Sequence, residues 1–213
     1  MKNLMNLETN INNKVENGLL FIPDISGFTK FVHRTDMLTG KLILQELLST
    51  IIDHNEMKLS ISEIEGDAVL FYRIGESPGF QELLKQFELM VTAFERKRRE
   101  LELIFFEPLD ISLKVIAHYG PMVGLQVGPF NKLYGEVVVQ AHELLKNSVT
   151  SKNYLLLTEV LLEQCGFNCD QNEDLLPENI NRLEMELKDI KFSYFDLRSK
   201  ADLRNRARRL RVS

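Results

Sequence analysis

The chain has 213 residues, of which 44% are hydrophobic and 27% charged, and its formal net charge is −5. This composition is ordinary for a globular protein and supplies enough apolar residues for one substantial core. No apolar stretch approaches the ~20 residues of a transmembrane helix, and the polar segment Met1–Glu16 lacks the apolar core of a secretory signal. Two cysteines, Cys165 and Cys169, are too few for a disulfide framework. We therefore expect a cytoplasmic protein with free thiols.

The charge is unevenly distributed. The last sixteen residues, 198–213, contain seven basic residues against one acidic residue, Asp202, which leaves a net charge of −11 on the rest of the chain. A basic tail on an acidic body is expected to dock on an acidic surface, which is its own body, a partner, a membrane or nucleic acid. The alternative is a tail that only increases solubility or forms a helix lying on its own domain. We expect residues 1–17 to be a polar extension and residues 198–213 to be a separate basic tail.

Apolar periodicity predicts that strands and helices alternate along residues 18–197. Apolar or alternating runs typical of strands occur at 18–24, 58–65, 68–72, 111–118, within 124–134, at 154–157 and at 191–197. Helical spacing of apolar residues occurs at 41–53, 78–102, 136–146 and 158–164. Gly66-Asp67 is predicted to form a hairpin turn, Gly120-Pro121 to end a strand, and 171–181 to be a loop. The pattern predicts one α/β domain without internal repeats.

Generic catalytic signatures are absent from the sequence, which has no phosphate-binding glycine loop, no nucleophile elbow and no zinc-protease motif. Two aspartates remain as candidates, because Asp24 closes the first predicted strand and Asp67 occupies the hairpin turn. Carboxylates at neighbouring strand ends can converge and, with substrate phosphates, bind Mg²⁺ for phosphoryl chemistry. Taken alone, Asp67 is better explained as an ordinary turn residue.

Six segments, in order and with plausible spacing, resemble the motifs of class III adenylate and guanylate cyclases. They are Phe21–Thr29 and Glu63–Ala68 for the two metal motifs, Lys114–Pro121 for the central strand, Leu133–Leu145 for the catalytic helix, and Tyr154–Glu159 and Leu187–Phe195 for the closing segments. The resemblance covers about residues 18–197. It implies an α/β (α+β) domain of the ferredoxin-like βαββαβ type, with a mixed, mostly antiparallel sheet and helices packed on it.

The resemblance also implies which residues bind ligands. Asp24 and Asp67 match the two aspartates that bind Mg²⁺ or Mn²⁺, and Ile25 matches the residue whose carbonyl joins them. Lys188 matches a lysine that binds the triphosphate of a nucleotide. Glu63 and Lys132 fall at the positions that recognise the base, where an ion pair between them would either recognise a base or fill the pocket as a structural salt bridge.

The predicted catalytic helix departs from the family's pattern. The family places an asparagine and an arginine there, which orient the ribose and stabilise phosphate charge, but this chain has Val139 and Glu143. Loss of one such charge-stabilising donor typically costs about 3–4 kcal/mol of barrier. Lys146 lies on the same helix face and is a possible substitute for the arginine, or simply a lysine that suits a helix C-terminus.

Three functional hypotheses follow. The first, which we favour, is a metal- and nucleotide-binding cyclase homologue with little or no cyclase activity and a sensing or regulatory role. The second is a working nucleotidyl cyclase that makes a cyclic nucleotide from a nucleoside triphosphate, in which Lys146 or a partner chain supplies the missing groups. The third is an interaction module that acts through the basic tail. The resemblance also implies a homodimer, because active sites of this superfamily form between two subunits.

Overall fold

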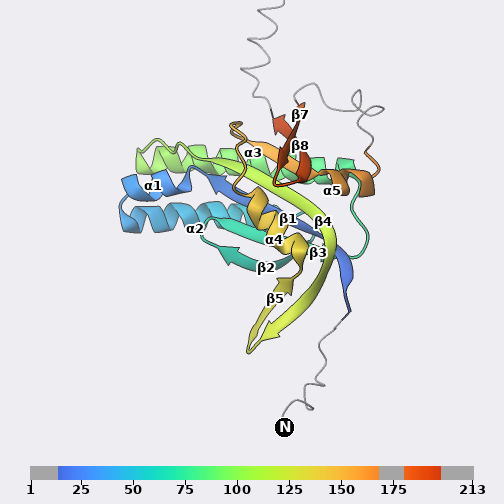
Figure 1. The fold of residues 1–213 in the computed structure, drawn as a ribbon. Helices are drawn as coiled ribbons and strands as arrows, with labels where there is room; N and C mark the ends of the chain where they lie inside the picture. The colour runs from blue at the N-terminus through green and yellow to red at the C-terminus, as the bar shows by residue number, and fades with distance from the viewer. Residues whose placement is uncertain (1–13, 168–179, 198–213) are drawn as a thin grey trace, which may run out of the picture.

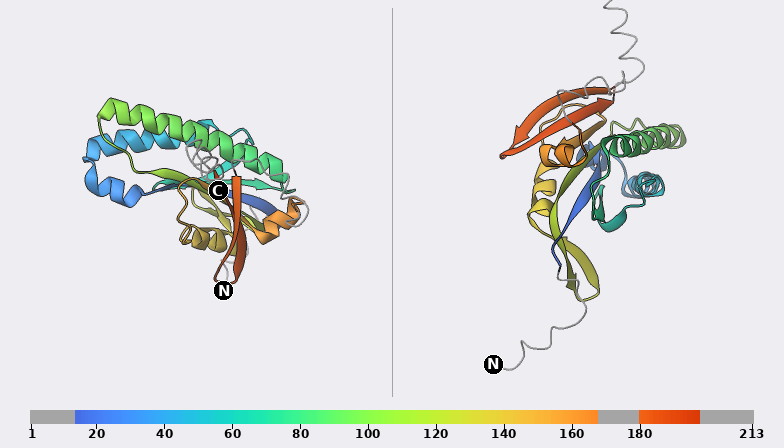
Figure 2. Two further views of the ribbon diagram at one scale, coloured as in Figure 1. Left: turned by 90° about the horizontal axis from the view of Figure 1, so that it is seen from above. Right: turned by 90° about the vertical axis from the view of Figure 1, so that its right-hand side faces the viewer.

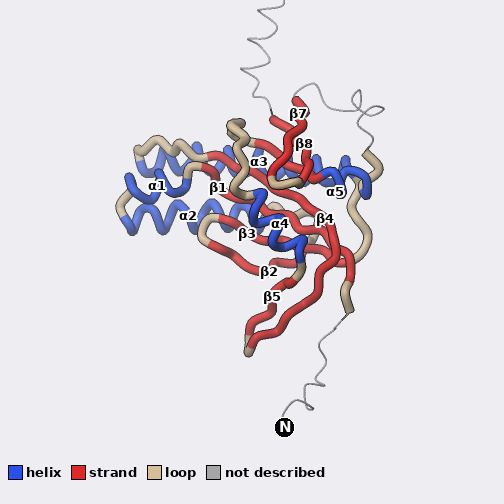
Figure 3. Tube along the Cα trace, in the orientation of Figure 1, coloured by secondary structure: helices blue, strands red, loops and turns tan. Residues whose placement is uncertain are grey.

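The computed structural model of the protein describes residues 14–167 and 180–197, in which strands and helices alternate (Figures 1 and 3). In chain order the elements are β1 (Glu16–Ser26), α1 (Phe28–Arg34), α2 (Met37–Asp53), β2 (Ser60–Glu65), β3 (Ala68–Ile74), α3 (Phe80–Phe105), β4 (Ser112–Val127), β5 (Phe130–Tyr134), α4 (Glu136–Leu144), β6 (Tyr154–Thr158), α5 (Glu159–Gln164), β7 (Ile180–Leu187) and β8 (Ile190–Leu197). The basic tail and most of the predicted N-terminal extension lie outside the described residues.

The strands of the described ranges form one mixed, eight-stranded sheet. Its order is β2-β3-β1-β4-β6-β8-β7, and β5 pairs with the far end of β4. β4 and β6 run parallel, whereas the other neighbouring strands run antiparallel. From β1 to β4 the elements follow the predicted βαββαβ order, except that two helices, α1 and α2, take the place of the first helix. The predicted fold class, a mostly antiparallel sheet with helices packed on it, is therefore confirmed.

The sheet separates two apolar cores. On one face α1, α2, α3 and α5 pack over side chains such as Phe21 and Leu113, and on the other face α4 packs over Leu20 and Ile116. Figure 2 shows α2 and α3 on one side of the sheet and α4 on the other. Successive side chains of a strand point to opposite faces. Asp24, which lies four residues after Leu20 on β1, therefore points to the face that α4 covers.

Local capping and one glycine set the course of the chain beyond β1. Gly27 has a φ of 87°, and a Cβ there would lie 2.7 Å from the carbonyl oxygen of Asp110, so only glycine fits without strain. α2 begins at Met37, four residues before the predicted start, because the Asp36 side chain caps it by accepting hydrogen bonds from two backbone N–H groups. α1, a short helix between Gly27 and this cap, was not predicted from the sequence.

Two strand predictions were incomplete. β4 continues through Gly120-Pro121 instead of ending there, because beyond Ala117 it has no partner on the β6 side and a proline is tolerated at such an edge. β7 was not predicted, although Leu183, Met185 and Leu187 alternate with polar residues. No helix in the described ranges is long and apolar enough to span a membrane.

Candidate functional site

The structure brings Asp24 and Asp67 together at one end of the sheet. Asp24 lies near the end of β1, opposite Ala68 of β3, and Asp67 occupies the turn between β2 and β3. The backbone N–H of Ile25 donates to the carbonyl oxygen of Asp67 at 3.3 Å, which fixes the turn against β1. Gly66 has a φ of 60°, which this tight turn accommodates at low cost. The two carboxylates therefore lie in the neighbouring positions that the sequence predicts.

Burial and mutual repulsion perturb both carboxylates. Burial raises the pKa of Asp67, and the charge of Asp24 raises it further, to about 6. Burial also raises the pKa of Asp24, although Lys114 opposes this effect. Carboxylates that repel each other in a partly buried position favour a cation between them. This electrostatic arrangement fits a divalent cation.

Lys114 is a residue of this cluster that the sequence analysis missed. It lies on β4 directly opposite Asp24, and its ammonium lies 3.3 Å from a carboxylate oxygen of Asp24. Both side chains are 16% exposed. The same ammonium donates to the carbonyl oxygen of Leu145 at the end of α4, at 2.8 Å. Only the register of β1 against β4 identifies this contact, and periodicity does not give the register.

Two carboxylates do not complete a metal site by themselves. No group of three or more His, Cys, Asp or Glu residues in the described part of the chain could hold a metal ion. Mg²⁺ usually binds through one or two carboxylates and takes its other ligands from substrate phosphates and water. Asp24 and Asp67, with the backbone carbonyl of Ile25, fit that kind of site.

The predicted base-recognition pair is joined in the structure. The Lys132 ammonium of β5 lies 2.7 Å from a carboxylate oxygen of Glu63 on β2. The hydrogen bond to Glu63 raises the pKa of Lys132. Lys132 also lines a pocket of about 650 Å³ between the β4–β5 hairpin and β2. The Glu63–Lys132 pair therefore lies at the edge of this pocket. Its position is compatible both with recognition of a base and with a structural salt bridge.

The predicted triphosphate lysine has an unexpected partner. Lys188 lies in the β7–β8 turn, where its φ is 48°, and its ammonium lies 2.7 Å from a carboxylate oxygen of Glu143 on α4. Glu143 is the residue that the resemblance puts at the position of an arginine. The exposed fractions of the Lys188 and Glu143 side chains are 65% and 34%. The acid on α4 therefore neutralises the lysine that the resemblance assigns to the triphosphate.

Val139 and Lys146, the other two residues named on the predicted catalytic helix, are exposed. Val139 is 60% exposed on α4. Lys146 follows the end of α4, and its ammonium makes no ion pair or hydrogen bond with the described residues. It lies next to Leu145, whose carbonyl oxygen accepts the hydrogen bond from Lys114. Lys146 is thus close in the chain to the contact that joins α4 to Asp24.

His118, which the sequence analysis did not single out, ties α4 to the centre of the sheet. Its ring is 4% exposed on β4 and lies 2.8 Å from both the Thr158 hydroxyl and the Gln140 side-chain oxygen. The amide of Gln140 donates in turn to Glu136. Burial lowers the pKa of His118, because the charged ring would lose its hydration there.

This network predicts a pH-dependent stability contribution. The unfolded chain takes up a proton on His118 below about pH 6.5, whereas the fold resists it. The neutral His118 ring therefore contributes to the free energy of unfolding above that pH. This contribution is lost as the pH falls towards the lower pKa of the folded state. We expect His118→Asn to lower the free energy of unfolding by about 2 kcal/mol at pH 7.5 and by less at pH 5.5. Urea unfolding at both pH values tests this, with His33→Asn as the exposed control. An equal loss at both pH values would contradict it.

Comparison with protein families gives one match. A family model described as "Protein of unknown function (DUF2652)" matches residues 44–154, just over half of the chain. No curated protein matches the chain in sequence.

Solved structures with a similar fold include nucleotidyl cyclase domains. The adenylyl cyclase CyaB from P. aeruginosa is 14% identical, with a TM-score of 0.59 over 89% of this chain and 97% of that one. The guanylyl cyclase Cya2 is 13% identical, with a TM-score of 0.63 over 86% and 92%. The guanylyl cyclase domain of the RhoGC fusion protein from the aquatic fungus Blastocladiella emersonii is 16% identical, with a TM-score of 0.61 over 87% and 97%. At these identities the similarity shows a class III cyclase-like fold.

Proposed function

Because the chain belongs to the DUF2652 family, whose description assigns no activity, we propose its function from its own site. We propose that it is a cyclase-like domain that binds a divalent metal ion and a nucleoside triphosphate, has little or no cyclase activity, and serves a sensing or regulatory role. The observation that carries this proposal is the 2.7 Å ion pair between Glu143 and Lys188. The position that the resemblance assigns to a catalytic arginine carries a carboxylate instead, and this carboxylate pairs with the lysine that the resemblance assigns to the triphosphate.

Metal binding is the part of the proposal that the aspartates support. Asp24 and Asp67 would hold Mg²⁺ or Mn²⁺ with the Ile25 carbonyl, and the bound ion would neutralise the charge of the phosphates. Lys114 balances the charge of Asp24 when no ion is bound. Asp24 therefore has a partner when no metal is bound, and it can exchange this lysine contact for a divalent cation.

The residues of α4 support the absence of cyclase activity in this proposal. Val139 cannot hydrogen-bond a ribose, and Glu143 repels a triphosphate while it also pairs with Lys188. Transition-state stabilisation in such sites comes mainly from fixed, correctly oriented charges and hydrogen-bond donors. A domain with these substitutions can bind a metal–nucleotide complex and respond to it without converting it.

We also propose that the domain works as a homodimer, in which α4 of one copy faces the aspartates of the other. The support is a set of exposed apolar side chains on the β4–β5 hairpin and α4, which are Leu125, Val127, Phe130, Tyr134 and Val139. Exposed apolar side chains of this size are common at protein interfaces. A second copy would cover them and complete the site with its own aspartates.

A titration of the purified protein with each nucleoside triphosphate, with and without Mn²⁺, tests the proposed function. We expect metal-dependent binding in calorimetry and no cyclic product in the same mixtures. Asp24→Asn should weaken the metal-dependent binding about tenfold or more, because it removes a carboxylate ligand. Asp53→Asn, at the exposed end of α2, is the matched control. Absence of any metal or nucleotide binding would refute the proposal.

A working nucleotidyl cyclase is the second candidate, and one observation favours it. Lys146 carries a positive charge near the end of α4 that no described residue neutralises. It is therefore available to a phosphate group in place of the family's arginine. Cyclic product from the titration mixtures would support this candidate, and its loss in Lys146→Gln would identify the lysine.

A further inference from the structure

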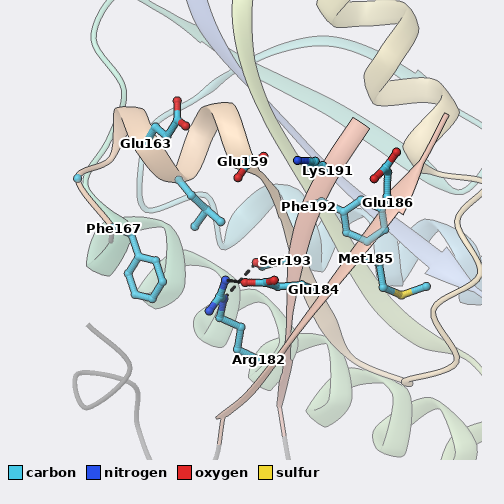
Figure 4. A pocket seen from close by; sticks show the side chains of 12 residues that line it. Glu159, Glu163, Phe167, Arg182, Glu184, Met185, Glu186, Lys191, Phe192 and Ser193 are labelled. Atoms are coloured by element: carbon cyan, nitrogen blue, oxygen red, sulfur yellow. Dashed lines mark hydrogen bonds and ion pairs between the residues drawn. The ribbon is translucent and has the colours of Figure 1, made fainter. Parts of the chain in front are cut away.

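A second pocket of about 820 Å³ lies between α5 and the β7–β8 hairpin, and none of the predicted site residues lines it (Figure 4). Part of its lining is apolar and comes from Leu162, Phe167, Met185 and Phe192. Phe167 stacks on Phe80 of α3 with ring centroids 4.1 Å apart, so this part of the wall is firmly held. The pocket therefore offers a fixed apolar surface.

The rest of the lining is rich in carboxylates. Four glutamates contribute, which are Glu159, Glu163, Glu184 and Glu186. Figure 4 shows Glu184 joined to Arg182. Within the described ranges, the other three glutamates form no ion pair, and the one further cation of the lining is Lys191. The pocket thus combines an apolar wall with excess negative charge, and this combination suits a cationic segment that also carries an apolar side chain.

The chain contains such a segment. The basic tail follows directly after β8 and includes the run Arg208-Arg209-Leu210-Arg211. Lys191, at the start of β8, lies about 20 Å along the strand from Leu197, at 3.3 Å per residue. The seven residues 198–204 can span about 23 Å when extended. Every arginine from Arg204 onward can therefore reach the pocket of its own chain.

We propose that the tail, residues 204–211, docks in the pocket between α5 and the β7–β8 hairpin of the same chain. The arginines pair with Glu159, Glu163 and Glu186, and Leu210 packs on the apolar wall. Arginine suits this position because its planar guanidinium binds carboxylates in bidentate fashion. The proposal does not depend on the proposed function, because it uses none of the residues of the metal and nucleotide site.

A double-mutant cycle on the full chain tests the docking. We expect Glu159→Gln/Glu163→Gln and Arg208→Gln/Arg209→Gln each to lower the Tm by about 2–4 °C at low salt. Together they should lower it by little more than either pair alone, because they remove the same contacts. High salt should abolish both effects. Asp53→Asn/Glu56→Gln is the matched control, which should show additive behaviour with the tail variant. Additive losses from the pocket and tail variants would overturn the proposal.

Cross-linking identifies the occupant directly. In Arg209→Lys, a zero-length carbodiimide reagent should join the new amine to Glu159, Glu163 or Glu186, as mapped by mass spectrometry. A mixture of ¹⁵N-labelled and unlabelled chains distinguishes cross-links within a chain from those between chains. Cross-linked peptides that carry one label in both halves, without mixed-label peptides, support docking within one chain. Mixed-label peptides would assign the pocket to the tail of a second copy, and cross-links only to other surfaces would exclude the pocket, so either result overturns the proposal.

Discussion

Val139→Asn/Glu143→Arg should give the protein measurable cyclase activity, at least about 100-fold above that of the unmodified chain. The double substitution restores the two residue types that the resemblance places on the catalytic helix. It also removes the carboxylate that holds Lys188 at 2.7 Å and so frees this lysine for a triphosphate. The measurement is cyclic product from each nucleoside triphosphate with Mn²⁺.

The matched control carries the same two substitutions together with Asp24→Asn. It should be inactive, because the restored helix cannot act without the metal ligand. Glu136→Gln, which removes one negative charge from the same helix, should give no activity. Tight, metal-dependent nucleotide binding by the double variant without any product would contradict the idea that α4 alone accounts for the missing catalysis.

Asp67→Asn should stabilise the metal-free protein above pH 6. The pKa of Asp67 is about 6 in the fold and 3.8 in the reference state, so the folded chain holds this proton more tightly than the unfolded chain. The contribution of protonated Asp67 to the free energy of unfolding is fully present below pH 3.8 and is lost as the pH rises through 6. Above pH 6 the ionised carboxylate destabilises the fold. Because the group is half-exposed, solvent screening reduces the effect, and we expect a gain of about 1 kcal/mol, or about 2–4 °C in Tm.

Thermal unfolding at pH 4 and pH 7.5, with and without Mn²⁺, measures this effect. Asp67→Asn should match the unmodified chain at pH 4, exceed it at pH 7.5, and gain nothing from Mn²⁺. The unmodified chain should be stabilised by Mn²⁺ at pH 7.5, because the ion offsets the repulsion between Asp67 and Asp24. Asp53→Asn should keep the response to Mn²⁺. A variant less stable than the unmodified chain at pH 7.5 would contradict the assignment.

The sequence predicted those parts of the site that depend on local pattern. An apolar run that ends in Asp24 and a glycine turn that carries Asp67 define two strand ends, and the structure places them side by side. The fold class followed from the order of strands and helices together with the resemblance. Contacts that depend on strand register could not be predicted from the sequence. Lys114 was missed as a site residue because only the register of β4 against β1 places it opposite Asp24.

The ion pair between Glu143 and Lys188 shows a second limit of sequence analysis. Each residue was singled out alone, but their contact requires the β7–β8 hairpin, and β7 was not predicted. β7 is rich in charged residues, and its weak alternation of Leu183, Met185 and Leu187 was the available signal. A strand at the edge of a sheet buries few side chains, so its hydrophobic pattern is faint.

The length of β4 gives the two ends of the site different mobility. Its sixteen residues extend for about 50 Å. Residues 114–117 have strand partners on both sides, whereas residues 123–127 pair with β5 alone. Hydrogen exchange should therefore be slow around Lys114 and fast along the hairpin that carries Lys132. A metal ion would bind at Asp24 and Asp67, where the strands are already ordered. A nucleotide base that contacts Lys132 would have to immobilise the hairpin. Recognition of the base would therefore carry an entropic cost that metal binding does not.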